Sequence, residues 1–186
     1  LPTLLACGTT GDPTSTATVA PTPLSTETSQ AKQASKDKGD FKVVYARVKN
    51  KDYAQFQKEL QQNKVLEGIA ADLNQTLALP FDVTLTFTEC GQANAFYDPN
   101  LHQISMCYEL IEDFYQLFSK NSEKEAEVDD AVANATIFTF FHELGHALVH
   151  VYELPITGKE EDAVDQLSTW ILAAGTDEGE KAAIDG

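Results

Sequence analysis

Two histidines and a glutamate lie close together in an apolar segment of the chain. Their order is His142-Glu143-Leu144-Gly145-His146, and the flanking residues are uncharged and include no proline. Such a segment is predicted to be helical, which places His142 and His146 one turn apart on one face. Imidazoles at that spacing can both reach one metal ion, and Glu143 beside them is a candidate general base. The pattern therefore predicts a metal centre that activates water, if other segments supply what such a centre needs.

A centre of this type needs a third protein ligand and an open position for water. His150 lies on the same predicted helix, eight residues after His142. That separation is about 12 Å along the helix axis, whereas a Zn–N bond is about 2.1 Å. We therefore exclude His150 as a ligand and interpret it as a polar residue near the helix C-terminus. His102 is interpreted as a surface residue of a hairpin.

Acidic residues that follow the next turn are better candidates for the third ligand. Pro155 is expected to end the helix that carries the histidines. Thr157 and Glu160 are typical of a capping box that begins a new helix. Glu161 and Asp165 are four residues apart and share a face of that helix. Because the turn is short, the two helices run antiparallel, so we expect Glu161 to reach the metal and Asp165 to hold a ligand histidine. The alternative is that these acids form only the solvated start of a helix.

The segments that must position these residues show a mixture of strand and helix patterns. The predicted strands are residues 41–48, 81–90, 93–97 and 101–107, and the predicted helices are 52–79, 108–120, 123–149 and one after 157. Pro80 ends the first helix. We predict an α+β domain in which a small β-sheet or hairpin packs on the active-site helix and a C-terminal helix carries the last ligand.

Cys90 and Cys107 close the second predicted strand and the hairpin that follows it. The two side chains can meet, and we favour a disulfide, as suits an exported protein. The alternative is two small buried apolar residues. A zinc role for either cysteine is disfavoured because neither belongs to a C-x-x-C pair.

The N-terminal part of the chain has the composition of an anchor and a tether. Residues 1–7 end in Leu4-Leu5-Ala6-Cys7 and resemble the end of a signal peptide with a bacterial lipobox. We expect Cys7 to be lipidated and to hold the protein on a membrane surface in the cell envelope or periplasm. The alternative is a secreted chain with a chance cysteine. Residues 8–40, rich in Ser, Thr and Pro, are predicted to be a disordered tether, and residues 41–186 the folded domain.

The charge of the chain excludes one class of function. The formal net charge is -16, with 13 Lys and Arg residues. Phosphate binding needs clustered basic side chains, so a nucleic-acid role is excluded. No stretch is long and apolar enough to span a bilayer as a helix, so we expect membrane contact only through the lipid anchor.

These residues together resemble a known group of enzymes. His142-Glu143-Leu144-Gly145-His146 followed by Glu161-Asp162-Ala163-Val164-Asp165 is similar to the gluzincin pattern, and residues 93–97 resemble the N-A-F/Y segment of compact gluzincins. Residues 41–170 resemble, more narrowly, a bacterial family described as metallopeptidases of unknown function. The resemblance implies a compact zincin-like fold, a zinc ion and peptide hydrolysis. It also implies that the natural chain continues beyond Gly186.

The sequence therefore predicts a zinc-dependent peptide hydrolase with His142, His146 and Glu161 as ligands and Glu143 as base. Ala93, Asn94 and Ala95 are expected to pair with an extended peptide substrate as an added strand. Tyr97, Tyr152 and His102 are candidates for stabilising the oxyanion. The alternatives are an inactive or structural-metal binding module of the cell envelope, and a coincidental motif without metal.

Overall fold

The computed structural model describes residues 37–120, 124–174 and 177–185. Over these residues the chain forms a mixed α+β domain, which confirms the predicted fold class. The strands are β1 (Phe41–Val43), β2 (Val83–Thr88), β3 (Ala95–Asp98) and β4 (Gln103–Cys107). The helices are α2 (Lys51–Gln62), α3 (Val65–Thr76), α4 (Tyr108–Phe118), α5 (Glu125–Val151), α6 (Glu160–Ala173) and α7 (Asp177–Asp185). None of these helices is both long and apolar enough to cross a membrane.

The four strands form one sheet in the order β1-β2-β4-β3. β1 and β4 run parallel to β2, whereas β3 pairs antiparallel with β4 through a hairpin. The hairpin was predicted, and its turn begins at Asp98, whose Oδ1 accepts hydrogen bonds from the amides of Asn100 and Leu101. One edge of β3 pairs with β4, and the other edge faces α5, where the Tyr97 amide reaches Glu143. This edge is the wall that the sheet contributes to the site.

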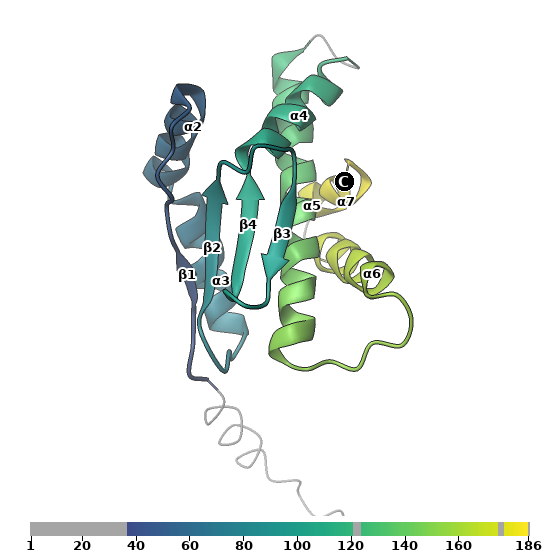
Figure 1. Ribbon diagram of the computed structural model, residues 1–186. Helices are drawn as coiled ribbons and strands as arrows, with labels where there is room; N and C mark the ends of the chain where they lie inside the picture. Colours follow the sequence, from purple (N-terminus) through teal and green to yellow (C-terminus); the bar gives the residue numbers. More distant parts are fainter. Residues whose placement is uncertain (1–36, 121–123, 175–176, 186) are drawn as a thin grey trace, which may run out of the picture.

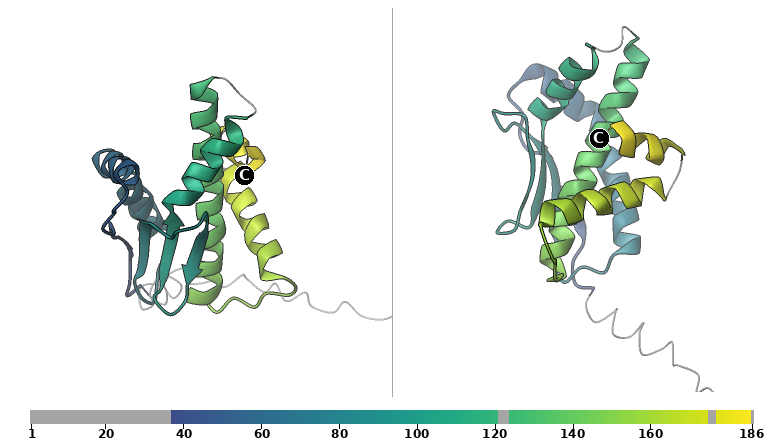
Figure 2. Two further views of the ribbon diagram at one scale, coloured as in Figure 1. Left: turned by 45° about the horizontal axis from the view of Figure 1, so that its top comes forward. Right: turned by 90° about the vertical axis from the view of Figure 1, so that its right-hand side faces the viewer.

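Helix α5 lies between the sheet and the pair formed by α6 and α7, as Figures 1 and 2 show. It is 27 residues long and buries a stripe that begins at Val128 and Val132 and ends at Val151. The buried stripe follows from helical periodicity, since residues three and four apart share a face. The helix ends in a Schellman motif, in which the Leu154 amide donates to the Val149 carbonyl and Glu153 has a left-handed φ of 50°. Helix α5 therefore ends before Pro155, the residue that was predicted to end it.

The predicted helix 52–79 is wrong in one respect, because two helices occupy this segment. The break lies at Asn63 and Lys64, and Lys64 is left-handed with φ 52° and ψ 40°. The change of direction lets α3 bury Leu66 and Ala70 beside β1, a contact that a straight continuation of α2 would not make. The N-cap of α2 is Asn50, whose side chain accepts a hydrogen bond from the Asp52 amide at 2.9 Å.

The two ends of the predicted first strand also differ from expectation. The register with β2 ends at Val43, and beyond it the Val44 amide donates to the Leu85 carbonyl, so residues 44–48 are not in the strand. Ordered contacts begin before Phe41, because Gly39 forms an antiparallel bridge with Leu79. Cys7 and residues 8–36 of the predicted tether lie outside the described residues.

Candidate metal centre and active site

Helix α5 brings the two histidines and Glu143 to the side that faces α6 and β3. Leu144 and Ala147 are each 1% exposed and anchor the opposite face in the core. His142 and His146 have side chains 20% and 18% exposed, so they sit at the boundary between the core and solvent. This partial burial restricts the imidazole rings and leaves part of each ring accessible to solvent.

The approach of α6 to α5 depends on a missing side chain. A Cβ added to Gly145 would lie 2.8 Å from Cβ of Val164, closer than real Cβ atoms approach one another. Glycine at this position therefore lets Val164, which is 1% exposed, pack directly on the α5 backbone. The first turn of α6 is thereby held over the histidines.

Three donor atoms converge between the two helices. Nε2 of His142 and Nε2 of His146 are 3.1 Å apart. Oε2 of Glu161 lies 3.2 Å from the first and 3.4 Å from the second. The three residues form one of the groups in which all donor atoms lie within 4.8 Å of one another. This geometry can hold one metal ion.

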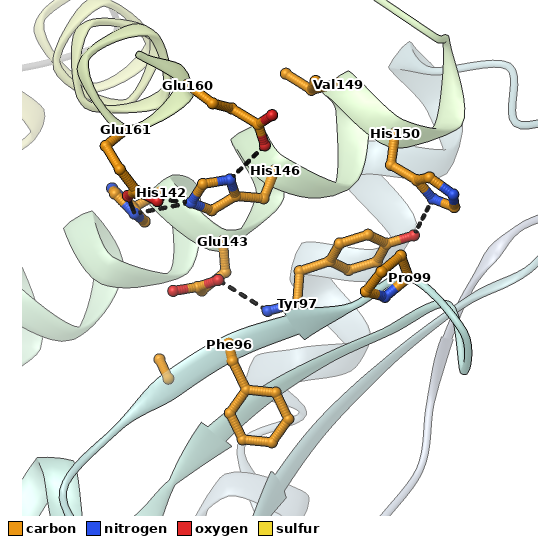
Figure 3. A pocket seen from close by; sticks show the side chains of 11 residues that line it. Phe96, Tyr97, Pro99, His142, Glu143, His146, Val149, His150, Glu160 and Glu161 are labelled. Atoms are coloured by element: carbon orange, nitrogen blue, oxygen red, sulfur yellow. Dashed lines mark hydrogen bonds and ion pairs between the residues drawn. The ribbon is translucent and has the colours of Figure 1, made fainter.

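The other ring nitrogen of each histidine contacts a carboxylate of α6, as Figure 3 shows for His146 and Glu160. Nδ1 of His142 is 2.7 Å from Oδ1 of Asp165, the contact expected from the sequence. Nδ1 of His146 is 2.7 Å from Oε1 of Glu160. A carboxylate accepts from Nδ1–H, so each imidazole is oriented with its Nε2 towards the other two donor atoms.

Glu160 is the site residue that the sequence analysis missed. The capping box predicted for it is wrong, because the N-cap of α6 is Lys159 and has no side-chain cap bond. The available signal was the run of three acids in the first turn of α6. Burial lowers the pKa of His146, but the hydrogen bond to Glu160 and the charges nearby outweigh it, so the pKa is raised.

Glu143 has the environment of a general base. It is 7% exposed, and its Oε2 accepts a hydrogen bond of 2.8 Å from the backbone amide of Tyr97 on β3. Burial raises the pKa of Glu143, and the neighbouring imidazoles and the Tyr97 amide offset this only in part. A carboxylate whose pKa moves upward towards neutrality is better matched to proton transfer near neutral pH.

A cavity of about 620 Å³ opens over these residues. Its walls are Glu160 and Glu161 of α6, the histidine face of α5, and residues 95–97 and 99 of the hairpin. Figure 3 shows Phe96, Tyr97 and Pro99 below the helix and His150 at the far end. The volume lies in the range of ligand pockets, about 300–1,000 Å³.

The structure separates the remaining candidates for substrate contact and oxyanion stabilisation. Ala95 and Tyr97 line the cavity, whereas Ala93 and Asn94 are not among its lining residues. Asn94 instead uses its carbonyl to accept from the Cys107 amide. Tyr152 donates its hydroxyl to the Ala78 carbonyl, and so it is not placed to meet an oxyanion in this cavity.

The two cysteines of the domain form the predicted disulfide, Cys90–Cys107. Beside it, Glu109 accepts from the amides of Cys90 and Gly91 at 3.0 and 2.8 Å. Burial alone would raise the pKa of Glu109, but these backbone hydrogen bonds lower it overall. The disulfide and the carboxylate together fix the loop that leads into β3.

Two imidazoles and a buried carboxylate on one helix, with a further carboxylate from a second helix, are the groups that metal-dependent hydrolases use. Comparison with protein families gives the same class. The sequence model of a family described as "putative metallopeptidase" matches residues 45–186. The chain belongs to this family, which supports a metallopeptidase-like function in general and implies a metal ion. No curated protein and no solved structure was found to match the chain.

Proposed function

We propose that the protein is a zinc-dependent peptide hydrolase, a metalloendopeptidase of the gluzincin type that acts in the cell envelope. The observation that carries the proposal is the convergence of His142, His146 and Glu161 beside Glu143. The family supports peptide hydrolysis, and the donor set supports the choice of metal.

The donor set fits zinc in number, type and spacing. Two imidazoles and one carboxylate are the ligands of one familiar type of catalytic zinc site. Donor atoms on a tetrahedral ion with bonds of about 2.1 Å are about 3.4 Å apart. The observed separations of 3.1, 3.2 and 3.4 Å agree with this value. When bound, zinc would lower the pKa of a coordinated water to about 7 and polarise a substrate carbonyl.

The residues of the chain supply the proton transfers and the orientation. Glu143 accepts the proton of the attacking water and then passes it to the leaving amine. Asp165 and Glu160 hold the two imidazoles through Nδ1. Burial of Glu143 keeps bulk water from competing for its carboxylate.

The edge of β3 is suited to bind an extended peptide. Tyr97 lies opposite Ile104 and directs its amide away from β4, towards Glu143. In an antiparallel ladder, residues two apart face the same way, so the backbone of Ala95 also points outward. The Tyr97 amide is used by Glu143, so an extended substrate would pair with the outward amide and carbonyl of Ala95 and lie beside the proposed metal ligands.

Location in the cell envelope rests on the sequence. The lipobox-like segment ending at Cys7 supports a lipid anchor, and the tether composition supports a domain held at some distance from the membrane. The proposed partners are peptide or protein substrates, with no nucleic acid.

The test compares the wild type with Glu143→Gln. Both proteins are expected to bind about one zinc per chain, because Glu143 is not a ligand. Cleavage of casein and of internally quenched peptides should fall by about 10²–10⁴-fold in the variant, since it lacks the base. Metal analysis and the two cleavage assays provide the measurement.

Two results would count against this proposal. Full activity in Glu143→Gln would exclude Glu143 as the base. A wild type that holds zinc and cleaves no peptide would favour the metal-binding module over the enzyme.

A further inference from the structure

Tyr97 contacts α5 at two points that lie two helical turns apart. Its backbone amide donates to Oε2 of Glu143, and its hydroxyl lies 2.8 Å from Nδ1 of His150. Glu143 and His150 are seven residues apart, about 10 Å along the helix axis. One residue of the edge strand therefore spans the part of α5 that carries His146.

The contact between Tyr97 and His150 lies on the wall of the cavity, which both residues line. The Tyr97 hydroxyl and Nδ1 of His150 are within hydrogen-bond distance, and the tautomer of the imidazole sets which of the two donates. Burial raises the pKa of the Tyr97 hydroxyl, so the phenol keeps its proton in this contact.

The His150 ring is held by aromatic neighbours as well. Its centroid is 6.2 Å from that of Phe81 and 5.8 Å from that of His102. Phe81 and His102 are themselves stacked at 3.9 Å. These rings come from the segment before β2 and from the hairpin turn, so the His150 side chain packs against residues outside β3 as well.

We propose that Tyr97 and His150 are positioning residues of the active site. Their hydrogen bond fixes the edge strand against α5, and the Tyr97 amide consequently holds the Glu143 carboxylate in place. Among the described residues, these two contacts are the hydrogen bonds that Tyr97 makes to α5. The effect on catalysis rests on the proposed function, whereas the effect of the Tyr97–His150 bond on the position of the edge strand does not.

The experiment uses Tyr97→Phe, His150→Ala and the double variant. Asn in place of His150 can offer Oδ1 near the position of Nδ1, so His150→Asn is the rescue variant. Tyr115→Phe is the matched control, because it removes a tyrosine hydroxyl bonded to Asp129 at 2.9 Å, outside this cavity.

The first measurement is hydrogen exchange of the Tyr97 amide, which needs no substrate. Exchange should accelerate at least about tenfold in Tyr97→Phe and His150→Ala, and it should return towards wild type in His150→Asn. The Tyr115→Phe control should exchange as the wild type does. Unchanged exchange in Tyr97→Phe and His150→Ala would overturn the proposal even if the protein proved to have no peptidase activity.

The second measurement is cleavage of internally quenched peptides at a temperature well below unfolding. Misplacement of a catalytic group by about 1 Å can cost about 10²-fold, so kcat should fall by about ten- to a hundredfold. KM and zinc content should stay near wild type, and the double variant should be no worse than either single one. A rise in KM with unchanged kcat would overturn the proposal and make His150 a substrate contact instead.

Discussion

Cys90, Cys107 and Glu109 lie as close together as His142, His146 and Glu161. In both groups the potential ligand atoms lie within 4.8 Å of one another. Both groups also combine soft or nitrogen donors with one carboxylate. By proximity and residue type, either could be taken for a metal site.

The two groups differ in what their donor atoms already bind. The sulfurs of Cys90 and Cys107 are joined to each other, and both oxygens of Glu109 accept from backbone amides. In the second group, both Nδ1 atoms are bound to carboxylates, which leaves both Nε2 atoms and Oε2 of Glu161 directed at one point. A metal site thus requires that neighbouring groups bond to the non-ligating atoms and leave the ligating atoms available to the metal.

The largest expected effect is the loss of zinc in Glu161→Ala. Zinc affinities in structural sites amount to roughly 10–16 kcal/mol shared among a few ligands, so removal of one should weaken binding about 10³-fold. Asp162→Ala removes the adjacent exposed acid and should bind zinc as the wild type does. Competition with a chromophoric chelator measures both. If Glu161→Ala held zinc at wild-type affinity, the contrast between the two groups would fail.

The corresponding test of the cysteine group replaces both sulfurs, as Cys90→Ser with Cys107→Ser. The disulfide joins residues 17 apart in sequence, and closure of a loop of that length stabilises a fold by about 3 kcal/mol. The free energy of unfolding from urea denaturation should fall by about that amount, whereas the folded variant should still bind one zinc per chain. Zinc loss from the folded variant would show that the cysteine group takes part in the metal centre.

The smallest expected effect belongs to Glu160→Gln. Partners of ligating histidines typically contribute about 10–100-fold to metal affinity, so zinc binding should weaken by that factor. Gln keeps the size of the side chain and removes its charge, so the change in affinity reports the carboxylate bonded to His146. Asp162→Asn is the matched control for the loss of one charge in the same turn. Unchanged zinc affinity in Glu160→Gln would leave Glu160 without a role at the metal.

Local patterns explain why part of the fold could be predicted. The four-residue spacing of His142 and His146 follows from helical geometry, and the alternation in β2 follows from strand geometry. The position of the hairpin turn was available from Asp98-Pro99-Asn100. The break at Lys64 could not be predicted in the same way, because the apolar spacing continues across it and packing against β1 decides the change of direction.

The sequence by itself determined the residue types of the site, the one-turn spacing of the histidines and the α+β class, since each depends on local periodicity. The tertiary structure decided which atoms meet. Gly145 allows α6 to approach, Glu160 turns from its own helix to His146, and the amide of Tyr97 reaches Glu143 across 46 residues of sequence. These contacts join segments distant in the chain, so they depend on the packing of whole helices and strands and leave no periodic signal in the sequence.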